Sequence, residues 1–322
     1  MSGGTGGGGT GGENGGGDTM GAPGLSGTTG PATSPGVREA VAADATALGE
    51  VARAALTLDA AQASPLVARL AQPPPGRRWT ALVSGDLDGV LFASMSEKDG
   101  SLGHIDLLAV VPGARGEGRG RALVAAAEEW LRAEGATEAR FAGNPPCYAW
   151  PGIDVRYTPA ACLAEELGYQ RYRTAWNMTV DLTADLSVQA DLVRLAAAGV
   201  TVHAAGREER DAVAAFVRRQ WNGNWAWEAE QATGCHYASR DGEILGFAAW
   251  GARPAWFGPM GTAPAARGLG VGRVLLCRCL AEQRAAGLTS AQISWVGPLG
   301  FYSRAVGARA ERVFWLYRRE LR

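Results

Sequence analysis

The sequence is poor in lysine, histidine and cysteine, and each shortage excludes a class of protein. Lys98 is the only lysine among 31 basic residues, and the formal net charge is -1, so we expect no nucleic-acid partner. The three histidines and five cysteines show no zinc-like spacing and no Cys-x-x-Cys pair, so neither a metal site nor a disulfide scaffold is expected. Buried thiols of this kind are typical of a reducing compartment, which predicts a cytoplasmic protein.

Long apolar runs are also missing. No segment reaches the roughly 18 apolar residues that a membrane span requires, so no membrane partner is expected. Residues 1–36 hold 16 of the 46 glycines, which predicts a disordered tail, and they lack the pattern of a secretory signal. The whole chain is 47% hydrophobic and 322 residues long, which fits a globular protein of about two domains.

One short segment occurs twice in the sequence. Pro112–Leu123 (PGARGEGRGRAL) recurs as Pro264–Leu275 (PAARGLGVGRVL), with eight residues shared in register. The offset of 152 residues is the length of a domain and too long for a solenoid repeat. The repeat therefore predicts two duplicated lobes, over residues 37–182 and 183–322. Strands and helices alternate in each, which indicates the α/β class.

Both lobes are expected to follow the same order: strand, glycine loop, helix, strand, short helix and a final alternating strand. The strands before the loops are predicted at His104–Val111 and Ala255–Gly261, and the final strands at Ala175–Leu182 and Arg312–Leu321. An amphipathic stretch, residues 186–197, either links the lobes or opens the second one.

The repeated glycine loop has the features of an anion site. Arg-Gly-x-Gly-x-Gly between a strand and a helix gathers backbone N–H groups on one concave surface, and the helix N-terminus adds partial positive charge. A dinucleotide fingerprint does not fit, because a Gly-x-Gly-x-x-Gly count begun at Gly116 or Gly268 ends on an arginine. The loop therefore suits a pyrophosphate.

These residues resemble the GNAT superfamily of acetyl-CoA-dependent N-acetyltransferases, whose signature Arg/Gln-x-x-Gly-x-Gly/Ala follows the fourth strand. Arg115–Gly120 and Arg267–Gly272 both match it, and the resemblance covers residues 37–322 as a tandem pair. It implies, in each lobe, a mixed, curved sheet flanked by helices, with acetyl-CoA in a V-shaped opening between the fourth and fifth strands. The coenzyme contacts expected from the two copies are Val110, Val111, Arg115, Gly116, Glu117, Gly118, Arg119 and Gly120, and Met260, Gly261, Thr262, Arg267, Gly268, Leu269, Gly270, Val271, Gly272 and Arg273.

The resemblance also implies direct transfer of an acetyl group to an amine, without an acyl-enzyme. A tyrosine on the short helix usually serves as the acid in this family. Tyr302, after Phe301, matches that place in the second lobe, whereas the first lobe has Leu163 and Ala164 there. We therefore expect an acyltransferase with catalysis in the C-terminal lobe. The alternatives are catalysis in the N-terminal lobe and a non-catalytic acetyl-CoA-binding protein or sensor.

The general base and the acceptor are less sharply defined. Glu228 and Glu230 are the candidate bases of the C-terminal lobe, in a segment where the acceptor-side helices of the family usually lie. Asp106, nine residues before Arg115, is the candidate of the N-terminal lobe. Tryptophans and asparagines in Trp221–Glu230 either serve lobe packing or suit a sugar ring. We expect a small-molecule amine acceptor, with an aminosugar favoured.

Overall fold

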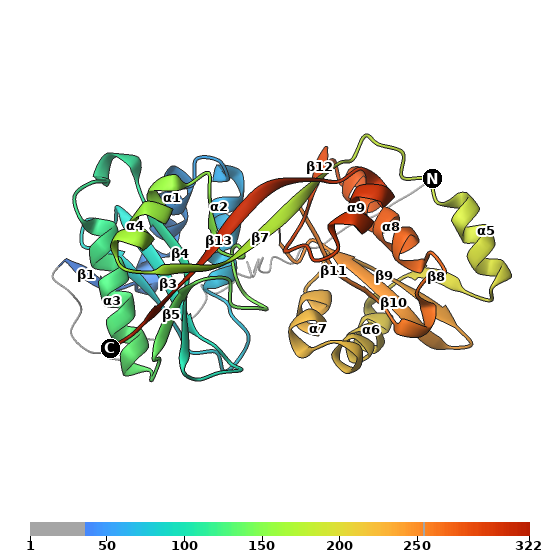
Figure 1. Cartoon of the computed structure of the whole chain (residues 1–322), viewed down its shortest axis with the longest axis horizontal. Helices are drawn as coiled ribbons and strands as arrows, with labels where there is room; N and C mark the ends of the chain where they lie inside the picture. Colours follow the sequence, from blue (N-terminus) through green and yellow to red (C-terminus); the bar gives the residue numbers. More distant parts are fainter. Residues whose placement is uncertain (1–35, 254) are drawn as a thin grey trace, which may run out of the picture.

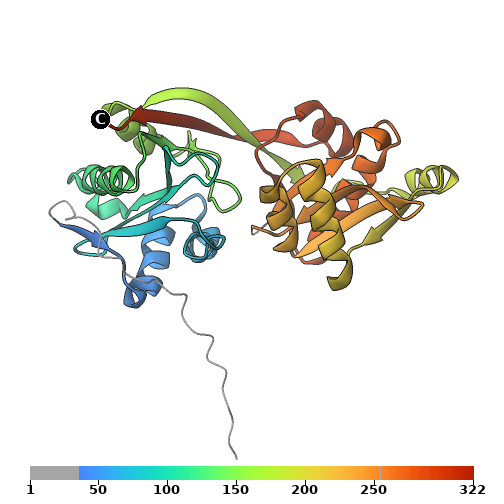
Figure 2. The same ribbon diagram turned by 90° about the horizontal axis from the view of Figure 1, so that it is seen from below.

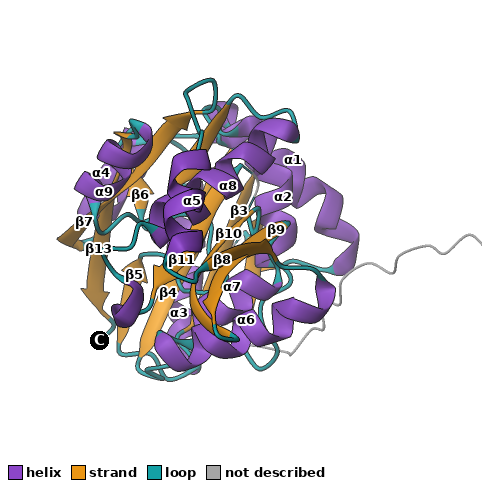
Figure 3. Ribbon diagram, turned by 90° about the vertical axis from the view of Figure 1, so that its right-hand side faces the viewer, coloured by secondary structure: helices purple, strands orange, loops and turns teal. Residues whose placement is uncertain are grey.

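The computed structural model describes residues 36–253 and 255–322, so all of the predicted tail except Gly36 lies outside the described residues. Within these ranges the chain forms two lobes side by side (Figure 1). One mixed sheet of 13 strands runs through both lobes and carries helices on its faces (Figure 3). The predicted α/β class and its mixed sheet are thus confirmed.

The N-terminal lobe begins with a meander of strands and ends at the strand that leads out of it. Its strands are β1 (Val37–Glu39), β2 (Trp79–Ser84), β3 (Gly89–Met95), β4 (Leu102–Val110), β5 (Glu138–Phe141) and β6 (Ile153–Asp154). Its helices are α1 (Ala45–Ala55), α2 (Ala60–Leu70), α3 (Arg119–Ala133) and α4 (Thr158–Glu166). Helices α1 and α2 cover one face of the sheet through Leu48 and Leu66, and α3 covers the other through Leu123 and Leu131.

The C-terminal lobe repeats this plan. Its strands are β8 (Thr201–Ala204), β9 (Gly234–Arg240), β10 (Glu243–Trp250), β11 (Trp256–Thr262) and β12 (Ser290–Ile293). Its helices are α5 (Gln189–Ala197), α6 (Arg207–Gln220), α7 (Gly223–Glu230), α8 (Val271–Ala285) and α9 (Leu299–Val306). The amphipathic stretch 186–197 contains α5, which packs on α8 and β8 and so opens this lobe.

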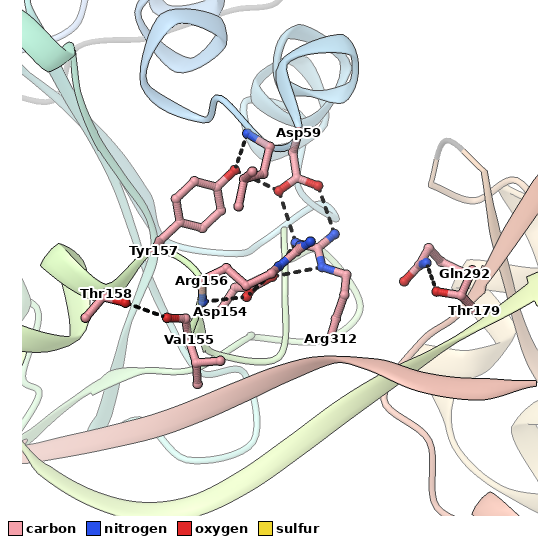
Figure 4. A network of polar contacts seen from close by, with 10 residues as sticks. Asp59, Asp154, Val155, Arg156, Tyr157, Thr158, Thr179, Gln292 and Arg312 are labelled. Carbon is pink, nitrogen blue, oxygen red and sulfur yellow. Dashed lines mark hydrogen bonds and ion pairs between the residues drawn. The ribbon is translucent and has the colours of Figure 1, made fainter.

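Two long antiparallel strands, β7 (Gln170–Asp181) and β13 (Arg309–Glu320), cross from one lobe to the other (Figures 1 and 2). β7 starts in the N-terminal lobe and ends beside β12, where Gln292 donates a hydrogen bond of 2.6 Å to Thr179 (Figure 4). β13 starts in the C-terminal lobe and ends beside β5, giving the order β5-β13-β7-β12. Both final strands lie where the sequence predicts them. Their exchange was not predicted, and the boundary between residues 182 and 183 stays a prediction.

In each lobe, the strand before the glycine loop separates from its parallel neighbour. β4 pairs with β5 only over Leu102–His104 and then continues to Val110 with β3 as its only strand partner. β11 pairs with β12 only at Trp256 and Phe257 and then continues to Thr262 with β10 as its only strand partner. The V-shaped opening implied by the resemblance is therefore present in both lobes.

Candidate active site

The opening of the N-terminal lobe contains a cavity of about 550 Å³. It extends along β4 from Ile105 to the glycine loop and is closed on its far side by α4 and by the segment around Trp150. Among the expected coenzyme residues, those that line it are Val110, Arg115, Gly116, Gly118, Arg119 and Gly120. Val111 and Glu117 are not part of its lining.

The glycine loop of this lobe presents a bare backbone. Gly116 and Gly118 have φ angles of +84° and +80°, a left-handed conformation in which a larger residue would be strained. A Cβ added at either position would meet no atom within 4 Å, so there is open space beside both glycines. α3 begins directly after Gly118, and no side chain caps its first amides. Free amides at a helix N-terminus are an anion site.

The two flanking arginines of this loop have different tasks. Arg115 donates to the backbone carbonyls of Val110 and Ala55, at 3.0 and 2.9 Å, so its guanidinium holds the loop against α1. Arg119 is paired with Asp88 at 2.8 Å and Asp86 at 3.0 Å. Both guanidinium groups therefore already have partners, and the backbone amides of the loop are the donors available to a phosphate.

Asp106 is a titratable residue in the middle of β4, along the cavity wall. It is the extra residue in a β-bulge, because Leu107 faces Phe92 while Ile105 faces the next residue of β3. Its Oδ2 accepts a 2.6 Å hydrogen bond from Ser94, and its Oδ1 has no partner among the described residues. Burial raises the pKa of Asp106 to about 7, and the Ser94 hydrogen bond limits that rise. A carboxyl group that titrates near neutrality suits a general base.

Tyr157 is a tyrosine of the N-terminal lobe that lines the cavity. Tyr157, just before α4, donates to Asp59 at 2.8 Å and accepts from the backbone N–H of Leu58 at 3.2 Å. Tyr148 packs under the guanidinium of Arg253, and Tyr169 donates to Glu128 in the core. Tyr157 is thus the tyrosine of this lobe that the structure brings to the opening.

The equivalent loop of the C-terminal lobe is open at Gly268 and has a side chain over Gly270. The two glycines have φ angles of +83° and +89°, like their counterparts; a Cβ on Gly268 would meet no atom within 4 Å, whereas one on Gly270 would collide with the guanidinium of Arg194. Arg194 belongs to α5, which is held beside the loop by an ion pair between Asp191 and Arg273. The space next to Gly270 is therefore occupied by the Arg194 guanidinium.

The opening of the C-terminal lobe is also filled by side chains. The buried Tyr302 packs edge-on against Phe257, and burial raises the pKa of Tyr302 to about 12. Phe301 and Met260 reach the space next to Gly272, where a Cβ would lie 3.5 Å from each of them. Of the other expected contacts, Gly261 lies under Trp221, Val271 is fully buried, Leu269 and Thr262 are half-buried, and Arg267 is exposed.

The two glutamates predicted as bases are committed to ion pairs. Glu228 is buried and accepts a 2.9 Å hydrogen bond from Arg253, whose guanidinium stacks on Tyr148 of the other lobe. Burial raises the pKa of Glu228, and the nearby arginines oppose that rise. Glu230 pairs with Arg218 at 3.1 Å on the surface. Glu228 is thus a contact between the lobes, and nothing in its surroundings presents it to the glycine loop.

The tryptophan segment belongs mainly to the packing of the C-terminal lobe. Trp221 and Trp225 stack on each other with ring centroids 5.9 Å apart and pack on Phe247. Trp227 lies under the guanidinium of Arg69 from α2. Asn222 caps α7 by accepting from the backbone of Trp225. These contacts match the packing interpretation of the segment.

Over residues 36–253 and 255–322, no three His, Cys, Asp or Glu side chains are grouped in a way that would hold a metal ion. Every helix in the same ranges is too short or too polar to span a bilayer.

The family model described as the acetyltransferase (GNAT) family matches residues 49–148 and 204–306, once in each lobe. The matches cover more than half of the chain, which therefore belongs to the GNAT family. The predicted tandem organisation and the predicted class, a GNAT-type acyltransferase, are confirmed with it.

Among curated proteins, a mycothiol acetyltransferase from Frankia alni is 32% identical over 215 residues, or 57% of this chain and 60% of that protein. The chain thus matches less than two thirds of the length of this relative. A solved glucosamine N-acetyltransferase region of a fungal multi-domain β-N-acetylglucosaminidase has a TM-score of 0.70 at 16% identity, over 88% of this chain and 38% of that one. A tandem GNAT protein from clavulanic acid biosynthesis has a TM-score of 0.66 at 19% identity, over 89% and 98%. These two structures share the fold.

Proposed function

We propose that the chain is an acetyl-CoA-dependent N-acetyltransferase that uses the N-terminal lobe for both coenzyme binding and catalysis. The observation that carries this proposal is the contrast between the two lobes. The N-terminal opening holds a cavity of about 550 Å³ that reaches a glycine loop with open space beside Gly118, whereas Arg194 lies over Gly270 of the C-terminal loop. Catalysis in the C-terminal lobe stays a prediction, and the geometry favours its alternative.

The polar groups along the cavity support a reaction between an anionic coenzyme and a cationic amine. At the loop end, the free amides of α3 are donors for a phosphate, whereas Arg119 pairs with Asp86 and Asp88 and Arg121 pairs with Glu166. Asp106 lies four residues back along β4 from Val110, which is about 13 Å in an extended strand. The pyrophosphate is therefore assigned to the loop and the reacting groups to the middle of β4.

The chemistry needs a base, an oxyanion donor and an acid. Asp106 takes a proton from the acceptor ammonium, and the freed lone pair of nitrogen forms a C–N bond with the thioester carbonyl carbon. Beyond His104, N–H groups of β4 on the side of the opening have no β5 partner and are free to bind the oxyanion. The C–S bond then breaks. Tyr157, whose hydroxyl hydrogen turns from Asp59 to the departing thiolate, protonates that sulfur, and the second proton of nitrogen passes through solvent to the tyrosinate.

The acceptor is proposed to be a small polar amine. Two of the matched proteins carry names that specify glucosamine and mycothiol, which supports testing amines on or near a sugar first. The tryptophan segment gives this choice no support, because its rings pack on Phe247.

The test compares matched variants of the two loops, Gly118→Glu and Gly270→Glu. Both glycines have similar positive φ angles, so the backbone strain of the two substitutions is comparable. For each variant, acetyl-CoA binding is measured by calorimetry, and turnover is measured as release of the CoA thiol with a panel of amines. We expect Gly118→Glu to lose both signals and Gly270→Glu to keep them.

Three results would contradict the proposal. Loss in Gly270→Glu alone would return the reaction to the C-terminal lobe. Tight binding without turnover on any amine would favour the acetyl-CoA-binding protein or sensor. Absence of binding in the wild-type chain would exclude acetyl-CoA as the ligand of both loops.

A further inference from the structure

The exchanged strand β13 brings an arginine of the C-terminal lobe to the wall of the N-terminal cavity. Arg312 is only 5% exposed and lies on β13 next to β7, opposite Asn177. Its nearest polar partners are carboxylates of the N-terminal lobe, Asp59 and Asp154. Arg312, which comes from the C-terminal lobe, is therefore bound by carboxylates of the N-terminal lobe.

The contacts of Arg312 form a rigid fork (Figure 4). Its two terminal nitrogens donate to the two oxygens of Asp59 at 2.9 and 3.1 Å, and its Nε donates to Asp154 at 2.9 Å. Arg156 also pairs with Asp154, at 2.8 Å, so two carboxylates are balanced by two guanidinium groups. A bidentate pair of this kind fixes orientation as well as charge.

Asp59 passes this constraint to the cavity. The oxygen of Asp59 that Arg312 binds at 3.1 Å also accepts the hydroxyl of Tyr157, at 2.8 Å. Tyr157 and Asp154 line the cavity, whereas Arg312 and Asp59 stand behind its wall. Removal of the guanidinium would leave the buried carboxylate of Asp59 without its ion pair and bound to Tyr157, while Asp154 would keep Arg156.

We propose that Arg312 is a positioning residue that, through Asp59, fixes the hydroxyl of Tyr157 at the wall of the N-terminal cavity, so that the C-terminal lobe completes the active site of its neighbour. This inference rests on the proposed function for its effect on turnover. Its structural part, the fixed hydroxyl of Tyr157, rests on the contacts alone.

The test uses Arg312→Lys, Tyr157→Phe and their double variant in the full chain. Lysine keeps the charge but has a single nitrogen, so it cannot bridge both carboxylates as the guanidinium does. Arg309→Lys is the matched control, because Arg309 lies on the same strand and pairs with Glu311 at the surface. The measurements are kcat, KM for acetyl-CoA, and hydrogen exchange of the Leu58 amide.

We expect kcat to fall about 100-fold in Tyr157→Phe and about 10-fold in Arg312→Lys, with KM for acetyl-CoA unchanged. The double variant should be no slower than Tyr157→Phe, because Arg312 acts through that hydroxyl. Additive losses, or equal losses in Arg309→Lys, would overturn the proposal.

Hydrogen exchange of the Leu58 amide tests the structural part of the proposal, the fixed hydroxyl of Tyr157, and requires no measurement of turnover. Leu58 donates to the Tyr157 oxygen, so its exchange should accelerate in both Tyr157→Phe and Arg312→Lys and stay unchanged in Arg309→Lys. Unaltered exchange in Arg312→Lys would overturn the positioning role. If the wild-type chain showed no turnover, the proposed function would fail while this readout still decided the role of Arg312.

Discussion

Gly258 stands in the C-terminal lobe at the position that Asp106 holds in the N-terminal lobe. Each lies nine residues before the arginine of its glycine loop and within the irregular part of its strand. The C-terminal lobe therefore has no carboxyl group at the place where the N-terminal lobe has one that titrates near neutral pH. The two lobes differ in chemistry as well as in access to their loops.

Replacing Asp106 should remove the base while keeping the shape of the wall. We expect Asp106→Asn to lower kcat about 100-fold and to leave the Kd for acetyl-CoA unchanged. In the wild-type chain, kcat/KM should rise with pH and level off above about 7, the pKa of Asp106. That rise should be missing from the variant. Asp241→Asn, in an exposed turn, is the control, and a wild-type pH profile in Asp106→Asn would exclude Asp106 as the base.

The same substitution should change how stability depends on pH. The pKa of Asp106 is about 7 in the folded chain and about 3.9 in an unfolded one, so between these values the folded state binds more protons. Stability from this group is present below pH 4 and is lost as pH rises toward 7. Urea unfolding should therefore show Asp106→Asn gaining on the wild type from pH 4 to pH 8, by at least about 1 kcal/mol. A constant difference would contradict the raised pKa.

Removing Arg194 should uncover the C-terminal loop without making a second coenzyme site. Arg194→Ala deletes the guanidinium over Gly270, but Phe301, Met260 and Tyr302 still fill the opening beyond it. We expect calorimetry to give one acetyl-CoA per chain in both the wild type and the variant. A stoichiometry of two in Arg194→Ala would show that Arg194 is what keeps the second loop closed.

The hydroxyl of Tyr302 should be dispensable. It makes no hydrogen bond within the part of the chain that the structure describes, and its ring is fixed by Phe257 and Phe301. We expect Tyr302→Phe to keep kcat within about twofold, as for a packed ring that retains its shape. A fall of 100-fold, beside an unchanged Tyr157→Phe, would support the sequence-based prediction that the C-terminal lobe is catalytic.

The sequence predicts the local features of this fold well. The glycine loops, the strands before them and the helices after them are encoded within about 25 residues each, in turns and hydrophobic periodicity. Asp106 was also predicted as a candidate base, from its place nine residues before Arg115.

Features that depend on contacts between distant parts of the chain could not be predicted from such local patterns. β7 and β13 have the same alternating pattern, so nothing in either strand specifies which lobe supplies its partner. The position of Arg194 over Gly270 and the pairing of Glu228 with Arg253 likewise join segments that are far apart in sequence. The match of Tyr302 to the position of the family's acid therefore led to a prediction of catalysis in the C-terminal lobe, although other side chains occupy the opening of that lobe.

The exchange of strands also sets an order of events during synthesis on the ribosome. β13 is the middle strand of β5-β13-β7, and its Phe314 and Leu316 lie in the hydrophobic core of the N-terminal lobe. The ribosome makes β13 only after every other strand and helix of the C-terminal lobe. Until then, β5 has an unpaired edge that invites association with other chains. The lobe that is made first therefore cannot complete its sheet until the last strand of the lobe that is made second has been synthesised.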